Sequence, residues 1–303
     1  MLKRVGVIHP KAKMASSKEL RRRIKSVKNT AQITKAMEMV AGTKMRRAQN
    51  QAISGRPYIE ALNKSLYQVL NTGDKISSSL LLPNESAKTA ILVLTTDKSL
   101  CGGLNTNIFR YIATMDTHQD WDLRKELTYY TVGKKGRQFI VRSTRTLSAD
   151  FENYESVDFS QVLKIQRVLR KLFLDSEISS VYLLYPHFVS VLQQIPTLIK
   201  ILPIQKTWGL ELTGLELKRQ IFLEPEKDVL VDYLLNHYLD AQIYQALLET
   251  KASEHSSRMI AMKNATDNAI ELVEDLKLGY NQIRQDTITR ELSEISGAAL
   301  ALE

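Results

Sequence analysis

Two short turns that follow apolar, strand-like runs are the first candidates for chemistry. The turn at residues 97–103 (DKSLCGG) contains Cys101, the one cysteine of the chain. The G-K-K-G turn at residues 133–136 has glycines and lysines that could contact a phosphate. No nearby sequence supplies a base for Cys101, so we favour a small residue packed in a tight turn over a nucleophile. For the second turn, a turn without a ligand is the commoner case.

Established catalytic and metal-binding spacings are missing from the rest of the sequence. There is no G-x-G-x-x-G, G-x-x-x-x-G-K-[ST], G-x-S-x-G or H-E-x-x-H. A single cysteine excludes an internal disulfide framework and a multi-cysteine zinc site. No metal-ligand spacing occurs among the five histidines, which are His9, His118, His187, His237 and His255. The sequence therefore predicts no catalytic residue, no cofactor and no metal.

Positive charge is concentrated at the N-terminus. The 303 residues carry a net charge of +9, yet residues 1–47 hold 14 Lys and Arg against two acidic residues, Glu19 and Glu38. The remaining residues hold 28 basic and 31 acidic groups. Such a basic arm is typical of binding to nucleic acid, an anionic membrane surface or an acidic protein. Because no apolar run approaches the ~20 residues of a membrane span, we expect a soluble protein.

The N-terminal region predicts a disordered extension followed by a long helix. Residues 1–15 lack the apolar stretch of a secretory signal and have few arginines for a transit peptide. Ser16 and Glu19 then have the spacing of a capping box. Apolar or small residues step by four and three from Leu20 to Ala48, and this clear pattern ends near Ile53. We predict a coiled-coil helix over residues 16–70, with an ordinary amphipathic surface helix as the alternative.

The C-terminal region predicts an even longer helix. Pro225, flanked by acidic residues, has the position of a first helical residue. From there a seam of apolar and small residues repeats every ~3.5 residues over eight heptads, with one stutter. His237 and His255 fall on this seam, so we expect them to pack there. Residues 225–303 form the predicted helix, and its core at residues 227–294 would be ~100 Å long. Two such helices pair most economically as an antiparallel coiled coil.

The middle of the chain, residues 86–205, predicts a central α/β domain. Residues 89–96 form a continuous apolar run, as in a strand buried on both faces. Further strands are expected at residues 127–132, 181–185 and 189–202, with helices at residues 107–115, near 138 and at 158–174. This alternation indicates a Rossmann-like domain with a mostly parallel sheet. The predicted fold class is therefore α/β plus a long antiparallel coiled coil.

Several stretches carry a family signature. Residues 15–48 contain the runs IKSVKNT at 24–30 and ITKAMEMVA at 33–41, and residues 96–105 are TDKSLCGGLN. Residues 252–259 are ASEHSSRM, residues 262–269 are MKNATDNA, and residues 288–295 are ITRELSEI. In this order they resemble the gamma subunit of F-type ATP synthases. The likeness extends from Met14 to the end of the chain.

The resemblance implies a rotary function. In this family the two terminal helices form a central stalk inside a ring of three alpha and three beta subunits. The α/β domain lies against an epsilon-type subunit and the membrane c-ring, so membrane contact is indirect. Proton flow turns the ring and the stalk, which transmits torque to catalytic sites on beta. The resemblance thus implies a subunit that is not itself an enzyme and that binds no nucleic acid. We expect it at the cytoplasmic face of a bacterial plasma membrane, with the mitochondrial matrix side as the alternative.

The resemblance also assigns coupling roles in the first half of the chain. Met37 matches the methionine of a K-A-M motif that faces beta. Lys98 and Cys101 match a loop near an acidic helical tip of beta. For Lys98, a solvated charge without such a role is an equal alternative. This loop has Lys98-Ser99 where the family usually has Arg-Gly.

Four further coupling residues lie near the C-terminus. Arg284 and Gln285 match an Arg-Gln pair that approaches a beta loop, and Thr289 and Glu291 lie in the adjoining signature. The family's terminal E-I-V-S-G-A is one residue shorter here, after Ile295, which rotates the last turn by ~100°.

Two other classes of function remain open from the sequence alone. A basic coiled coil that binds nucleic acid would account for the N-terminal arm but leave the α/β domain unexplained. A nucleotide-dependent enzyme would account for the sheet, but the phosphate-binding loops are missing.

Overall fold

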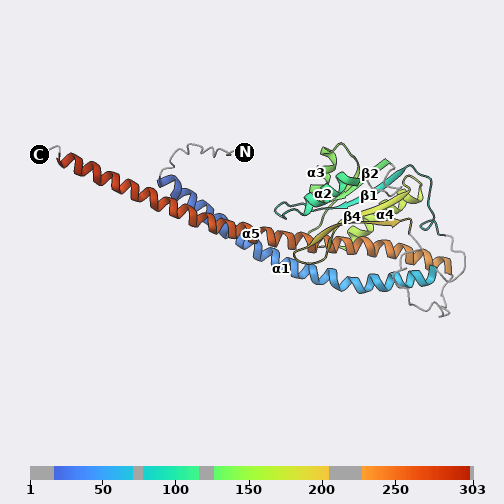
Figure 1. The fold of residues 1–303 in the computed structure, drawn as a ribbon. Helices are drawn as coiled ribbons and strands as arrows, with labels where there is room; N and C mark the ends of the chain where they lie inside the picture. Colours follow the sequence, from blue (N-terminus) through green and yellow to red (C-terminus); the bar gives the residue numbers. More distant parts are fainter. Residues whose placement is uncertain (1–16, 71–77, 116–125, 205–226, 301–303) are drawn as a thin grey trace, which may run out of the picture. The chain divides into compact units, whose positions relative to one another are not determined.

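The computed structural model describes residues 17–70, 78–115, 126–204 and 227–300. The predicted extension at 1–15, the capping residue Ser16 and the helix start at Pro225 lie outside these residues. The elements in chain order are α1 (Ser17–Leu70), β1 (Lys88–Leu94), α2 (Leu104–Thr114), β2 (Glu126–Val132), α3 (Lys134–Arg142), β3 (Thr146–Phe151), α4 (Phe159–Leu174), β4 (Ser180–Phe188), β5 (Gln194–Leu202) and α5 (Lys227–Leu300) (Figure 1).

The chain divides into two compact units. The first contains Met1–Glu38 and Met262–Glu303, and the second contains Met39–Ala261. The long helices α1 and α5 each contribute to both units. The domain boundaries expected from the sequence stay a prediction.

The central sheet has the order β3-β2-β1-β4-β5. β1 pairs in parallel with β2 and β4, β2 pairs in parallel with β3, and β5 is antiparallel to β4. Every residue of β1 except Lys88 is buried, as its apolar run predicts. The prediction of a mostly parallel sheet is confirmed. β5 begins at Gln194 and not near 189, because residues 189–193 form the turn that joins it to β4.

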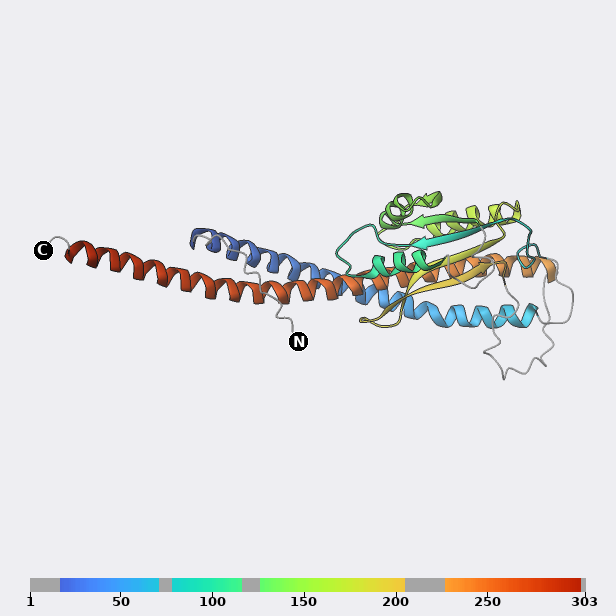
Figure 2. The ribbon, with the colours of Figure 1, turned by 45° about the horizontal axis from the view of Figure 1, so that its top comes forward.

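Helices cover both faces of the sheet in the second unit. Ile91 and Val93 of β1 face α2 and α3, where they pack with Ile108 and Ile140. The alternate β1 residues, among them Leu92, pack in a larger core on the other face. That core takes residues from α1, α4 and α5: Leu62, Leu66, Val162, Ile165, Val231 and Leu235 are examples. Figure 2 shows α1 and α5 side by side along this face.

The helix α1 continues through Gly55 and Pro57 to Leu70, well beyond its clear periodicity. A proline inside a helix costs about 3 kcal/mol. Burial offsets this cost, because Leu62 and Leu66 lie in the larger core at 8% and 4% exposure. In the same unit Gln245 of α5 donates from Nε2 to the Ala52 carbonyl at 2.9 Å, which ties the two helices together.

The first unit is a two-helix coiled coil. Figure 1 shows α1 and α5 running in opposite directions, and the hydroxyl oxygens of Thr34 and Thr266, which lie 2.7 Å apart, set the register of this antiparallel pair. The predicted seam is at least partly buried on both helices, at Leu20, Ile24, Val27, Ala31, Met262, Thr266, Ala269 and Val273. The antiparallel pairing predicted from the seam is therefore confirmed. By this register Ile283 lies level with Ser17, and α5 is exposed at every residue from 284 to 296.

Candidate subunit-coupling sites

The loop after β1 holds Cys101 inside and Lys98 outside. Cys101 is 3% exposed, whereas Lys98 is exposed. Thr96 donates from Oγ1 to the Lys98 carbonyl at 2.8 Å, and Asn105 donates from Nδ2 to Thr96 Oγ1 at 2.8 Å and to Cys101 Sγ at 3.4 Å. Leu100 adopts a φ of 65°, in the left-handed region. Cys101 thus packs within a tight turn that presents Lys98 to solvent.

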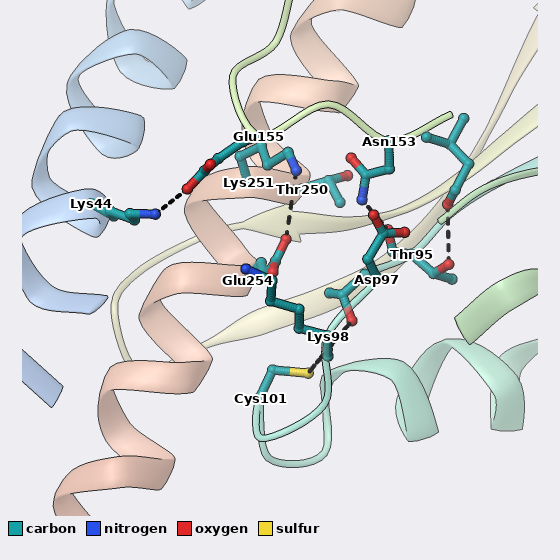
Figure 3. Close-up of polar contacts among 12 residues, drawn as sticks. Lys44, Thr95, Asp97, Lys98, Cys101, Asn153, Glu155, Thr250, Lys251 and Glu254 are labelled. Carbon is teal, nitrogen blue, oxygen red and sulfur yellow. Dashed lines mark hydrogen bonds and ion pairs between the residues drawn. The ribbon is translucent and has the colours of Figure 1, made fainter. Parts of the chain in front are cut away.

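This loop is docked on α5 within the second unit. Ser257 donates from Oγ to the Cys101 carbonyl at 2.8 Å, and Arg258 reaches the Ser99 carbonyl at 3.4 Å. Arg258 also donates to Glu254 Oε1 at 2.9 Å. Figure 3 shows the loop facing α5 beside the Lys44–Glu155 and Lys251–Glu254 pairs. A movement of this part of α5 would therefore carry the loop with it.

The G-K-K-G turn is closed by the protein's own groups. The Lys134 N–H donates to Asp97 Oδ1 at 2.9 Å, and the Gly136 N–H donates to Thr95 Oγ1 at 2.9 Å. The Lys135 N–H donates to the Thr96 carbonyl at 3.1 Å. These are the α3 N-terminal groups that a phosphate would need. Of the two interpretations of this turn, the geometry supports a turn without a ligand.

The place where doubly wound sheets bind ligands is occupied here by side chains of α1 and α5. That place is the carboxyl end of the sheet between β1 and β4, where the strand order reverses. Here Ser253 of α5 donates to the Pro186 carbonyl at 2.8 Å, and Arg56 of α1 donates to the Phe188 carbonyl at 2.6 Å. The carboxyl end of β4, at Pro186 and Phe188, thus contacts both α1 and α5. We call this contact region the seat of the two helices.

A buried carboxylate organises that seat. Glu249 of α5 has a side chain that is 4% exposed. Its Oε1 accepts from Arg56 at 3.2 Å and from Gln245 at 3.0 Å. Its Oε2 lies 2.5 Å from His187 Nδ1 and accepts from the Phe188 N–H at 3.4 Å. No sequence pattern predicts this network, because its members lie up to 193 residues apart. One local feature pointed to a buried charge: Glu249 directly follows the apolar residues 246–248 of α5.

The remaining coupling candidates lie in the first unit. Met37 is partly buried, whereas the four C-terminal candidates are exposed. Arg284 and Glu291 share one side of α5, since seven residues are two helical turns. Gln285 and Thr289, four residues apart, share another side.

The structure does not bring Met37 and the C-terminal group together. By the Thr34–Thr266 register, Met37 lies level with residue 263. Arg284 is 21 residues further along, or about 32 Å at 1.5 Å per residue. Lys98 and Cys101 belong to the other unit.

Within residues 17–70, 78–115, 126–204 and 227–300, none of the helices is both long enough and apolar enough to cross a membrane. In the same part of the chain, no three His, Cys, Asp or Glu side chains gather in a way that could hold a metal ion.

Comparisons with known proteins agree with the signature in the sequence. A family model described as ATP synthase matches residues 16–302. The ATP synthase gamma chain of Opitutus terrae is 40% identical over 299 residues, which cover 95% of this chain and 99% of that protein. The gamma chain of Polynucleobacter necessarius is 41% identical over 296 residues, covering 95% of this chain and all of that protein.

Solved structures show a similar fold. A chain of the Tetrahymena thermophila mitochondrial ATP synthase, in a structure of its central stalk and c-ring, is 26% identical with a TM-score of 0.57. The match covers 77% of this chain and 99% of that one. A chain of the Euglena gracilis mitochondrial ATP synthase has a TM-score of 0.69 over 94% of both chains at 20% identity, a likeness of fold alone. From the family model and the gamma-chain relatives together, the chain belongs to the ATP synthase gamma chain family.

Proposed function

We propose that this chain is the rotary central stalk of a proton-translocating F-type ATP synthase. It transmits torque between a membrane c-ring and the catalytic sites of the beta subunits. The observation that carries this proposal is α5, a single helix of 74 residues that contributes to both units. In the second unit it is held by the sheet, the 97–103 loop and α1, and in the first it pairs with α1. An unbroken helix held in this way can pass a twist along its length.

A rotor must also present a different surface to each catalytic subunit. Rotation can bias three equivalent sites only if each orientation makes different contacts with them. In the first unit the two helices differ in charge. α1 carries basic residues at Lys18, Arg21, Arg22, Arg23, Lys25, Lys28 and Lys35, against Glu19 and Glu38. α5 carries acidic residues at Asp267, Glu271, Glu274, Asp275, Asp286, Glu291 and Glu294, against Lys263, Lys277, Arg284 and Arg290. This asymmetry supports the proposal.

The proposed partners are three alpha and three beta subunits, an epsilon-type subunit and the c-ring. Catalysis belongs to beta, and the gamma chain supplies no catalytic residue. The bacterial relatives support the cytoplasmic face of a bacterial plasma membrane as its place, with membrane contact through the c-ring. The mitochondrial matrix side is the alternative.

The seven coupling residues have different roles in this proposal. Lys98 offers an exposed charge to an acidic partner, and Cys101 acts through the turn that presents it. Arg284, Gln285, Thr289 and Glu291 offer two sides of exposed helix to beta. Met37 acts at another level of the coiled coil, about 32 Å away along the axis.

Co-expression with cognate alpha and beta subunits tests the proposal. Native mass spectrometry should find one copy of this chain in an assembly of three alpha and three beta subunits. ATPase activity should require all three kinds of subunit. If the chain stays outside such an assembly and binds duplex nucleic acid at ~200 mM salt, the proposal is wrong and the basic arm has another partner.

A further inference from the structure

A pocket in the second unit has no part in the coupling surfaces described above. It has a volume of about 330 Å³ and lies between α1, α5 and the segment that joins β3 to α4. Its charged and titratable lining residues are Lys44, Arg47, Glu155, Lys251 and His255.

Positive charge is the main feature of the pocket. Lys44 and Arg47 lie one turn apart on α1, and Lys251 faces them from α5. The Lys251 side chain is 13% exposed, and burial lowers the pKa of its ammonium group. The carboxylate that pairs with Lys251 is that of Glu254, at 3.8 Å, and it makes a closer contact with Arg258, at 2.9 Å. Lys251 is therefore a mostly buried cation for which the attraction of Glu254, Asp97 and Glu155 does not outweigh the effect of burial. Such an arrangement is costly unless a further anion comes near.

One resident carboxylate enters the pocket, and it is able to leave. Glu155 pairs with Lys44, as Figure 3 shows, and the positive charges of Lys98 and Lys251 act on its carboxylate more weakly. Its side chain is 76% exposed and belongs to the segment between β3 and α4. A hydrogen bond from Lys44 is the main reason that the pKa of Glu155 is lowered. An incoming anion can take the place of this carboxylate without breaking any buried contact of Glu155.

His255 adds hydrogen-bonding groups to the pocket without adding charge. Burial lowers the pKa of its ring to about 4, so the ring is neutral at pH 7. Its buried Nδ1 has no hydrogen-bond partner among the described residues. A neutral ring has one donor nitrogen and one acceptor nitrogen.

We propose that this pocket binds a tetrahedral oxyanion of the phosphate class, held by Lys44, Arg47 and Lys251 in place of the Glu155 carboxylate. The guanidinium of Arg47 can bind two oxygens at once, and each ammonium group binds as a point charge. Inorganic phosphate and the phosphate groups of a nucleotide share this chemistry, and both fall within the proposal.

Phosphate titration of the purified full-length chain at constant ionic strength tests the site. We expect a saturable rise in the thermal unfolding midpoint and saturable broadening of the phosphorus NMR signal. Lys251→Gln should weaken phosphate binding at least tenfold. Arg47→Gln should weaken it as well, and because Arg47 is exposed, this variant should fold normally. Glu155→Gln should tighten binding, because it removes the competing carboxylate. Lys171→Gln is the matched control, since it removes an exposed lysine of α4 outside the pocket and should change nothing.

A second titration with magnesium-free ATP separates the two sources of phosphate. Tighter binding of ATP than of phosphate, lost in Lys251→Gln, would assign the site to a nucleotide. Equal or weaker binding of ATP would assign it to inorganic phosphate. A rise that never saturates would reflect the general stabilising effect of phosphate salts and would overturn the proposal. Equal responses in Lys251→Gln, Arg47→Gln and Lys171→Gln would overturn it as well.

Discussion

The carboxylate of Glu249 on α5 contacts both Arg56 of α1 and the carboxyl end of β4. This buried carboxylate accepts hydrogen bonds from side chains of α1, α5 and the end of β4. Glu249→Gln keeps the shape but removes the charge, so Arg56 and His187 lose their anionic partner. We expect a loss of about 3 kcal/mol in the free energy of unfolding, the low end for a broken buried pair, because both partners remain about one third exposed.

Urea denaturation of the full-length chain measures this loss. Glu155→Gln is the control, since it removes the same charge from an exposed carboxylate. The unfolding midpoint should fall strongly in Glu249→Gln and hardly at all in Glu155→Gln. Similar midpoints for the two variants would show that the network does not hold the seat together.

His255 predicts a dependence of stability on pH. Its pKa is about 4 in the folded chain, against an ordinary value of 6.5. Between these values the unfolded chain binds a proton that the folded chain does not, so acidification from pH 6.5 towards 4 favours unfolding. The free energy of unfolding should fall by up to about 1.4 kcal/mol per pH unit from this group.

The variant His255→Gln lacks the ring that takes up this proton on unfolding. Urea midpoints measured from pH 7 to pH 5 should therefore fall less steeply in the variant than in the parent chain. Identical slopes would mean that His255 titrates as it does in water.

Among the secondary-structure elements, the helices of the coiled coil could be predicted because the sequence pattern that specifies them is local. The three-and-four spacing of residues such as Ile24 and Ala269 specifies a buried stripe whatever lies elsewhere in the chain. β3 was missed because it is an edge strand of six residues with alternating partial burial and no apolar run. The loop with Lys98 and Cys101 was placed correctly at the end of β1. Its docking on Ser257 was not predictable, because no local pattern joins residues 156 positions apart.

Gly133 at the start of α3 gives a prediction at this scale. It adopts a φ of +102°, and a Cβ there would lie 2.4 Å from the Thr95 carbonyl oxygen. Gly133→Ala should therefore lower the thermal midpoint by several degrees, through strain and displacement of the β1 end.

Gly279 of α5 is the matched control, because a Cβ there meets nothing within 4 Å. Gly279→Ala should stabilise the helix by about 0.5–1 kcal/mol. Calorimetry of both variants checks the pair. A neutral Gly133→Ala would mean that the turn tolerates a side chain and that its contacts with Thr95 and Asp97 are loose.

For the molecule as a whole, a single-molecule assay measures directly whether this chain rotates within an assembled complex. Leu192, 83% exposed in the turn before β5, is a site for a Leu192→Cys probe, since the native Cys101 is buried. With the alpha and beta subunits immobilised, we expect stepwise rotation of the probe in one direction, driven by ATP. A complex that hydrolyses ATP while the probe stays still or only fluctuates would contradict it.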